Sequence, residues 1–155
     1  MAIAPNTTFT SGQVYTATMA NAYGFGIVGF SSSTSNSAAL TTALVTQFTV
    51  TFTAIANRYY KYTYYEPQAL TSNVAAQYIQ AVVKNGATIL QQSFLGQTAA
   101  VAKFSAVELV GISTFTAGSI TLTAQALSSS TSGTPLLNRG ATQPGFFVIE
   151  DIGPA

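Results

Sequence analysis

Apolar and polar residues alternate along the segment that covers residues 45–54. Phe48, Val50, Phe52 and Ala54 fall on one side of an extended chain, and glutamine and threonine residues fall on the other. Side chains of a β-strand point alternately to opposite faces, so this pattern predicts a half-buried strand with one apolar face. The β-branched and aromatic residues of the segment also favour extended structure.

Similar patterns recur along the rest of the chain, with turn residues between them. The residue pair Asn85-Gly86 is the one expected for a type I′ hairpin turn, and Asn57-Arg58 is a second turn signal. Further strands are predicted over residues 59–65, 76–84, 88–95, 104–110, 119–126 and 146–152. No amphipathic helix longer than about two turns fits the pattern. The chain is therefore predicted to be an all-β protein, a single antiparallel β-sandwich of jelly-roll type with roughly seven or eight strands.

The first part of the chain, residues 1–29, is predicted to be an extended N-terminal docking arm that precedes a β-sandwich domain over residues 30–155. Two stretches rich in serine and threonine, residues 31–37 and 128–134, are predicted to be solvated loops. The glycines within residues 24–29 superficially resemble a phosphate-binding loop, but no strand–helix unit accompanies them. We interpret these glycines as positions of close packing or of a bend.

Charged residues are unusually scarce. They make up 6% of the chain, and the net charge is +1, whereas ordinary soluble proteins carry roughly 25% charged residues. So few charges give little repulsion between copies, and we expect the surface to be buried in an assembly or covered by neutral polar side chains. Nucleic-acid binding needs clustered cations, so no nucleic-acid partner is expected. No uninterrupted apolar run of about 18 residues is present, so no membrane partner is expected either.

The residue types that carry most enzymatic chemistry are rare. Histidine and cysteine are absent, which removes the usual general base, the commonest metal ligand and any disulfide. The four acids are Glu66, Glu108, Glu150 and Asp151. Glu150 and Asp151 are neighbours on a predicted strand and should point to opposite faces, so they form a poor catalytic pair. We expect each acid to pair with a basic side chain, and we predict no enzyme, with no catalytic, cofactor-binding or metal site.

Five tyrosines within residues 59–65 are the most conspicuous local feature. On an exposed face they could stack on sugar rings or form a subunit interface, where tyrosine is enriched. Alternatively, every second tyrosine could fill the edge of the core with its hydroxyl group reaching the surface. Tyr60, Tyr62 and Tyr64 project to one side of the predicted strand, and further rings project to the other. Because a one-sided core cannot absorb both sets, we expect one set to lie between the subunits of a homotrimer or a similar small cyclic oligomer.

Two segments near the ends of the chain resemble a known group of proteins. Residues 9–21, Phe-Thr-Ser-Gly-Gln-Val-Tyr-Thr-Ala-Thr-Met-Ala-Asn, are similar to the opening of many tailed-bacteriophage structural proteins. Phe9, Gln13 and Ala20 stand where Trp, Glu and Leu are usual in that group. Residues 147–154, Phe-Val-Ile-Glu-Asp-Ile-Gly-Pro, are similar to the Val-Glu-Asp-Ile-Gly-Pro ending of phage minor tail and virion surface proteins.

The resemblance implies a structural component of a bacteriophage particle surface, either a head-decoration protein or a minor tail or fibre protein. Its partners would be other copies of itself and other virion proteins, such as a major capsid or tail protein. Its location would be the virion, assembled in the host cytoplasm. The alternative is a host-glycan or receptor-binding module of a phage tail, which the tyrosines and the Ser/Thr loops suggest. The candidate interface residues are Phe9, Tyr15, Met19, Tyr60, Tyr62 and Tyr64.

Overall fold

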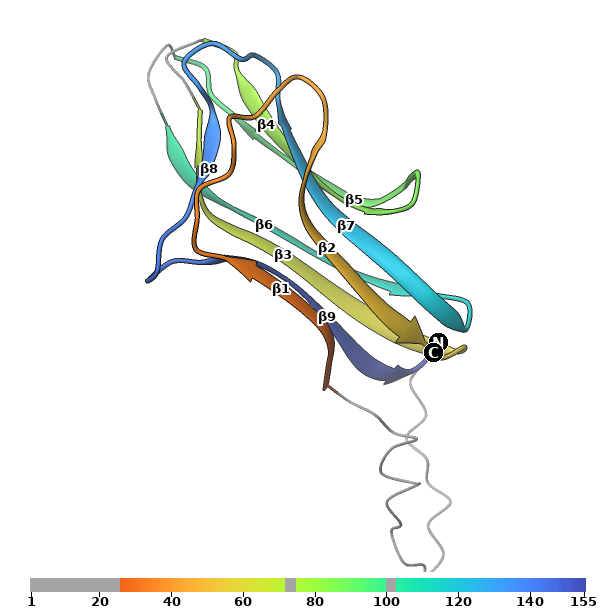
Figure 1. The fold of residues 1–155 in the computed structure, drawn as a ribbon. Coiled ribbons are helices and arrows are strands. Elements are labelled where there is room, and N and C mark those ends of the chain that lie inside the picture. The colour runs from red at the N-terminus through yellow and green to blue at the C-terminus, as the bar shows by residue number, and fades with distance from the viewer. Residues whose placement is uncertain (1–25, 72–74, 100–102) are drawn as a thin grey trace, which may run out of the picture.

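A computed structural model describes residues 26–71, 75–99 and 103–155 of the chain. These residues form two β-sheets that pack face to face (Figure 1). The strands are β1 (Gly26–Ser33), β2 (Val45–Ala54), β3 (Arg58–Leu70), β4 (Tyr78–Asn85), β5 (Thr88–Gly96), β6 (Phe104–Thr114), β7 (Gly118–Ser128), β8 (Leu136–Asn138) and β9 (Gly145–Pro154). In the described part of the chain, no helix is long and apolar enough to cross a membrane.

The strand order is that of a jelly roll. One sheet, called sheet A below, has the order β1-β9-β3-β6, and the short strand β8 pairs with one end of β3. The other sheet, sheet B, has the order β2-β7-β4-β5. All pairs are antiparallel. With β8 set aside, the remaining eight strands are distributed between the sheets as in a jelly roll, which confirms the predicted fold.

The core lies between the sheets and follows the predicted alternation. Phe48, Val50, Phe52 and Ala54 of β2 are all buried in it, while the threonines between them are exposed. Strands β4 and β7 contribute their apolar alternate residues in the same way, as Ile79, Ala81, Val83, Leu122, Ala124 and Ala126. Burial of a large aliphatic or aromatic side chain contributes about 1.5–3 kcal/mol, so this shared layer is the main source of stability.

Strand β1 departs from the sequence prediction. It begins at Gly26, so the last four residues of the predicted arm and the start of the predicted Ser/Thr loop are strand, paired antiparallel with β9. The glycine content has a packing reason here, because a Cβ atom on Gly29 would overlap the side chain of Val50 on β2. Gly29 therefore lets the edge of sheet A approach sheet B closely, as the sequence suggested. The remainder of the predicted arm, residues 1–25, lies outside the described residues.

The two predicted turns are present, with one difference in conformation. Asn57 has a φ of 59° between β2 and β3, as a turn residue should. The β4–β5 hairpin also forms, but Asn85 pairs with Thr88, so its central residues are Gly86 and Ala87. Of these two, Gly86 alone has a positive φ, which is the feature of a type II′ turn. The predicted type I′ turn is therefore wrong, and the hairpin register is shifted by one residue from the expected one.

Candidate functional site

Sheet A presents an apolar outer face to the surroundings. The cross-strand register places Phe30, Val148, Thr63 and Val110 in one row across β1, β9, β3 and β6. Phe30 is 59% exposed and Val110 is 43% exposed. Phe104 points to the same side at the far end of β6, because it lies an even number of residues from Val110. An exposed apolar surface that runs across a whole sheet marks an interaction site more often than a lone exposed side chain does.

The neighbouring row holds the charges at the centre of this face. Ile27, Glu150, Lys61 and Ile112 lie side by side across the same four strands. The Lys61 ammonium lies 3.0 Å from a Glu150 carboxylate oxygen, and both side chains are partly exposed. Ile27 and Ile112 flank this ion pair at the two edges of the sheet, and each is more than half exposed. The outer face of sheet A is thus largely apolar, with one neutralised ion pair in the middle and the exposed carboxylate of Glu108 on β6.

The outer face of sheet B is built from different residues. Thr49, Thr51 and Thr53 line it on β2, and threonine and glutamine residues continue it on β7. The hydroxyl groups of Thr51 and Thr121 are hydrogen-bonded at 2.8 Å, and the Gln80 amide donates to Gln92 at 3.0 Å. The main apolar feature is the ring pair of Tyr78 and Phe94 near the β5 edge, with centroids 5.6 Å apart. Over β2 and β7, this face carries the neutral polar coat that the composition predicted.

The tyrosines of β3 are divided between the two faces of sheet A. Tyr60, Tyr62 and Tyr64 point into the core and are at most 2% exposed. Their partners belong to the same chain: the Tyr60 ring packs on Phe52, and the Tyr60 hydroxyl accepts a hydrogen bond from the backbone N–H of Ile55. A side chain buried within its own subunit offers no surface to a neighbour. The prediction of these three tyrosines as interface residues is therefore corrected, and they are core residues.

The remaining candidate interface residues, Phe9, Tyr15 and Met19, lie outside the described part of the chain. The outward set on β3 consists of Tyr59, Lys61, Thr63 and Tyr65. Of these, Tyr65 packs on Phe146 of β9 with ring centroids 5.2 Å apart. The tyrosine segment thus does contribute to the outer face, but through the residues that the sequence analysis did not choose.

A buried ion pair joins β3 to the segment between β8 and β9. The Arg139 guanidinium donates to both carboxylate oxygens of Glu66, at 2.7 and 2.5 Å, and the Tyr64 hydroxyl donates to the same carboxylate at 2.9 Å. The guanidinium also lies over the Phe48 ring. Burial, and next the negative charge of Glu66, raise the pKa of Tyr64 well above its usual range. Every oxygen of Glu66 is occupied, so this network holds the sandwich together and is not placed to bind a ligand.

A second buried ion pair explains the C-terminal motif. The Arg58 Nε donates to a carboxylate oxygen of Asp151 at 2.6 Å, and the other oxygen accepts the backbone N–H of Gly153 at 3.0 Å. Gly153 has a φ of 115°, which side-chain-bearing residues rarely adopt. Asp151 and Gly153 therefore fix the end of β9. Glu150 lies between the buried residues Ile149 and Asp151, and its side chain points to the outer face.

The acids do not form a catalytic pair. Glu150 and Asp151 point to opposite faces of sheet A, as predicted. Glu66 is buried, whereas Glu108 is exposed on the opposite face of the same sheet. The described residues contain three ion pairs, which pair Glu66, Glu150 and Asp151 with basic side chains as expected. Glu108 is in none of these three pairs, so the expectation fails for this acid. No group of three or more potential metal-ligating side chains occurs among the residues that the structure describes.

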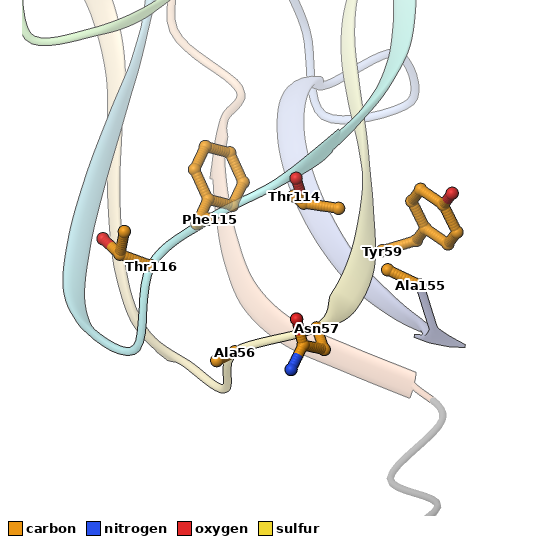
Figure 2. A pocket seen from close by; sticks show the side chains of 7 residues that line it. All are labelled: Ala56, Asn57, Tyr59, Thr114, Phe115, Thr116 and Ala155. Atoms are coloured by element: carbon orange, nitrogen blue, oxygen red, sulfur yellow. The ribbon is translucent and has the colours of Figure 1, made fainter.

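One shallow hollow of about 700 Å³ lies at the end of the sandwich (Figure 2). Its lining residues are Ala56, Asn57, Tyr59, Thr114, Phe115, Thr116 and Ala155. In Figure 2, Tyr59 and Phe115 project on either side of Thr114. The Phe115 ring packs on Phe52 and Tyr60 and so closes the end of the core. Tyr59 is therefore the lining ring that a ligand could contact. The amide of Asn57 and the hydroxyl groups of Thr114 and Thr116 line the same hollow.

Comparison with known proteins gives distant likenesses in structure alone. No protein-family model matches the chain, and no curated protein matches it. The fold is similar to the Eiger TNF structure from S. frugiperda, with a TM-score of 0.45, 10% identity, and coverage of 86% of this chain and 94% of that one.

Two viral proteins are also among the similar structures. One is the T13 IBDV viral particle protein, with a TM-score of 0.43, 9% identity, and coverage of 81% of this chain and 36% of that one. The other is a pentameric capsid protein from metagenomic phage sequences, with a TM-score of 0.32, 15% identity, and coverage of 97% and 82%. At this distance, none of the three likenesses carries an argument about function.

Proposed function

We propose that this protein is a structural subunit of a virus particle and acts by protein–protein assembly, without a catalytic step. The observation that carries the proposal is the outer face of sheet A. Phe30 is exposed there on β1, and Val110 and Ile112 are exposed on β6, whose other face contributes Val107 and Leu109 to the core. Exposed apolar side chains gain free energy when a protein partner covers them, at about 25 cal/mol for each Å² of apolar area removed from water.

The charge distribution supports the same proposal. Three ion pairs use six of the nine charged side chains of the protein, and two of those pairs are buried. The surface therefore carries little charge to repel a neighbouring subunit, and little to attract a nucleic acid or an ionic substrate. These properties suit a subunit that is held permanently in an assembly.

The more specific proposal is a bacteriophage subunit of head-decoration, minor tail or fibre type. It rests on the resemblance of residues 9–21 and 147–154 to phage structural proteins. The second of these segments lies in β9, an inner strand of sheet A. Its Glu150 takes part in the outer face, whereas Asp151 and Gly153 fix the strand end. The motif would thus maintain the sheet that carries the proposed contact surface.

Incorporation into particles tests this function directly. We expect the protein to be found by mass spectrometry in gradient-purified particles from a producing culture. Val110→Asp places a carboxylate in the apolar face, and we expect it to be lost from the particles. Thr49→Asp places the same group on the outer face of sheet B and should be retained. Absence of the wild-type chain from particles, or equal incorporation of the two variants, would contradict the proposal.

A second candidate function is the binding of a neutral host glycan at the hollow at the end of the sandwich. The observation that favours it is the combination of the Tyr59 ring with the Asn57 amide and the Thr114 hydroxyl. Aromatic rings stack on sugars, and amides and hydroxyl groups can bond to sugar hydroxyls. We expect glycan-array binding to be lost in Tyr59→Ala and kept in Tyr65→Ala. A glycan array without any hit for the wild-type protein would remove this candidate.

A further inference from the structure

We infer that the partner of the outer face of sheet A is the same face of a second copy of this chain, related by a two-fold axis that runs parallel to the strands between β9 and β3. The inference rests on the proposed assembly function and names the partner in it. A two-fold interface requires a surface that is complementary to itself. Three properties of this face meet that requirement: the strand order, the placement of the charges and the area.

The strand order makes the face nearly symmetric about its own midline. The order β1-β9-β3-β6 places an edge strand with exposed apolar side chains on each side of two inner strands. Glu108 of β6 is the exposed charge outside the midline, in the same cross-strand row as Ser32 of β1. A rotation about the midline puts β1 of one copy over β6 of the other. Phe30 then faces the partner's Val110, because both belong to the same cross-strand row. In the next row, Ile27 faces the partner's Ile112 in the same way, so apolar side chains cover apolar side chains.

The charges at the centre become complementary under the same rotation. Lys61 on β3 and Glu150 on β9 lie directly opposite each other in the register and form an ion pair within the chain. The rotation places Lys61 over the partner's Glu150, and Glu150 over the partner's Lys61. The result is a cluster of two positive and two negative charges in alternation. An axis perpendicular to the strands would instead place like charges together, which opposes association.

The area of the face is also sufficient. Four strands at a spacing of about 4.8 Å, each about nine residues long with a rise of about 3.3 Å per residue, give a flat area of about 600 Å². The uneven surface of the side chains adds to this area. A standard protein interface buries about 800 Å² on each partner. Twisted sheets pack face to face with their strands inclined by about 30°, at a separation of about 10 Å. A single pair of sheet A faces therefore provides an interface of ordinary size.

Complementary charge variants test the arrangement in solution. The wild-type protein should sediment as a dimer at micromolar concentration. Lys61→Glu leaves two carboxylates at the centre of each face, and Glu150→Lys leaves two ammonium groups, so each variant alone should sediment as a monomer. An equimolar mixture of the two variants should recover the dimer mass, because a negative face then meets a positive face. A purely intrachain role of the ion pair predicts no such recovery on mixing.

Two controls keep the test decisive. The double variant Lys61→Glu with Glu150→Lys exchanges the charges and should sediment as a dimer, while Thr49→Glu on sheet B should leave the dimer intact. Circular dichroism shows whether each variant retains its strands. A wild-type monomer or trimer, a variant that dimerises alone, or a mixture that stays monomeric would overturn the inference.

The outcome for the proposed function is separate from this one. A protein that dimerises as described but is absent from purified particles would leave the two-fold contact standing and remove the virion role. A protein that is present in particles but behaves as a monomer or a trimer in solution would leave the virion role standing and remove the two-fold contact. The same sedimentation measurement tests the homotrimer or similar small cyclic oligomer expected from the sequence. Tyr60, Tyr62 and Tyr64, which were named for its interface, are buried in the core.

Discussion

The two sheets of this protein distribute polarity in opposite ways. Sheet B is apolar inside, with residues such as Leu122 and Ile79, and its outer face over β2 and β7 is covered largely by threonine and glutamine. Its exposed apolar side chains lie near the β5 edge, where they include Phe94. Sheet A holds both buried ion pairs and the tyrosine hydroxyls on its inner face, and it leaves Phe30 and Ile112 exposed on its outer face. A soluble sandwich needs only the sheet B pattern, in which the apolar side faces the core. Sheet A has exposed apolar side chains on its outer face as well, and this contrast supports the proposed partner.

The difference also has a consequence for the core. The buried polar groups on the inner face of sheet A have hydrogen-bond partners, because no buried side-chain nitrogen or oxygen of the described residues lacks one. Such a network is stable only while all its members are present, since a buried group that loses its partner keeps the full cost of its lost hydration. Sheet A should therefore be sensitive to single polar substitutions inside, whereas sheet B should tolerate polar substitutions outside.

The largest expected effect breaks the ion pair inside sheet A. Glu66→Gln keeps the shape of the side chain but leaves the Arg139 guanidinium buried without a counter-charge. Loss of one partner of a buried ion pair costs about 3–5 kcal/mol, so the free energy of unfolding in urea should fall by that amount. Thr51→Val removes a hydrogen bond on the outer face of sheet B and should change it by less than about 0.5 kcal/mol. Equal losses of unfolding free energy in the two variants would mean that the two sheets do not differ in their sensitivity to the loss of a polar interaction.

A pair of glycines gives the next largest contrast. Gly111 lies on β6 beneath the ring of Tyr62, and a Cβ atom there would overlap that ring, whereas Gly96 on β5 of sheet B has open space around it. Gly111→Ala should cost about 1–3 kcal/mol through overpacking. Gly96→Ala should be neutral or stabilise by up to about 1 kcal/mol, because it restricts the unfolded chain. Thermal unfolding of the two variants measures the difference, and a Gly111→Ala protein as stable as the wild type would show that the Tyr62 ring can move aside.

The smallest expected effect concerns alkaline pH. The pKa of Tyr64 is raised in the folded state by burial and by Glu66, so the folded protein holds this proton at pH values where the unfolded chain has lost it. Folding stability from this group is therefore complete below the usual tyrosine pKa of about 10 and decreases as the pH rises above it. Tyr64→Phe removes this decrease, at the cost of about 1 kcal/mol near neutral pH for the lost hydrogen bond.

The matched control for this titration is the exposed Tyr78 on sheet B. Tyr78→Phe should leave the alkaline decrease in stability as it is in the wild-type protein. Urea unfolding at a series of pH values above about 9 separates the variants. If Tyr64→Phe and the wild type lose stability in parallel over that range, the buried tyrosine is not the source of the decrease.

The sequence was sufficient for the sheets but not for the faces of β3. In β2 and β7 most apolar residues fall on one side, so strand positions and core residues could both be predicted. In β3 both sides carry rings, and the period-two pattern cannot tell which side is the core. Arg58 and Glu66 lie on the same side of β3 as Tyr60, Tyr62 and Tyr64, which is the inner side. Their ion-pair partners, Asp151 and Arg139, lie far away in the sequence, so no local pattern indicates this choice.

The outer apolar face was missed although a signal for it exists. Strand β6 carries apolar side chains on both faces, with Leu109 pointing inward and Val110 and Ile112 pointing outward beside Glu108. Such a strand is typical of one that is covered on both sides. The Gly-rich and Ser-rich composition of β1 concealed Phe30 in the same way, because it is more typical of loops. The pairing of β1 with β9 depends on residues at opposite ends of the chain, which no local pattern indicates.

That pairing bears on when the sheet can form during synthesis. Strand β9 lies between β1 and β3, so sheet A has a gap in its middle until the residues from Gly145 onward have left the ribosome. Contacts between such distant segments form late and slowly, because the long loop between them must be closed first. Sheet B, by contrast, contains only strands that are already synthesised by Ser128. The nascent chain therefore cannot present the apolar face of sheet A as a flat, continuous surface until the whole sandwich exists, and this timing would keep partly made subunits from associating.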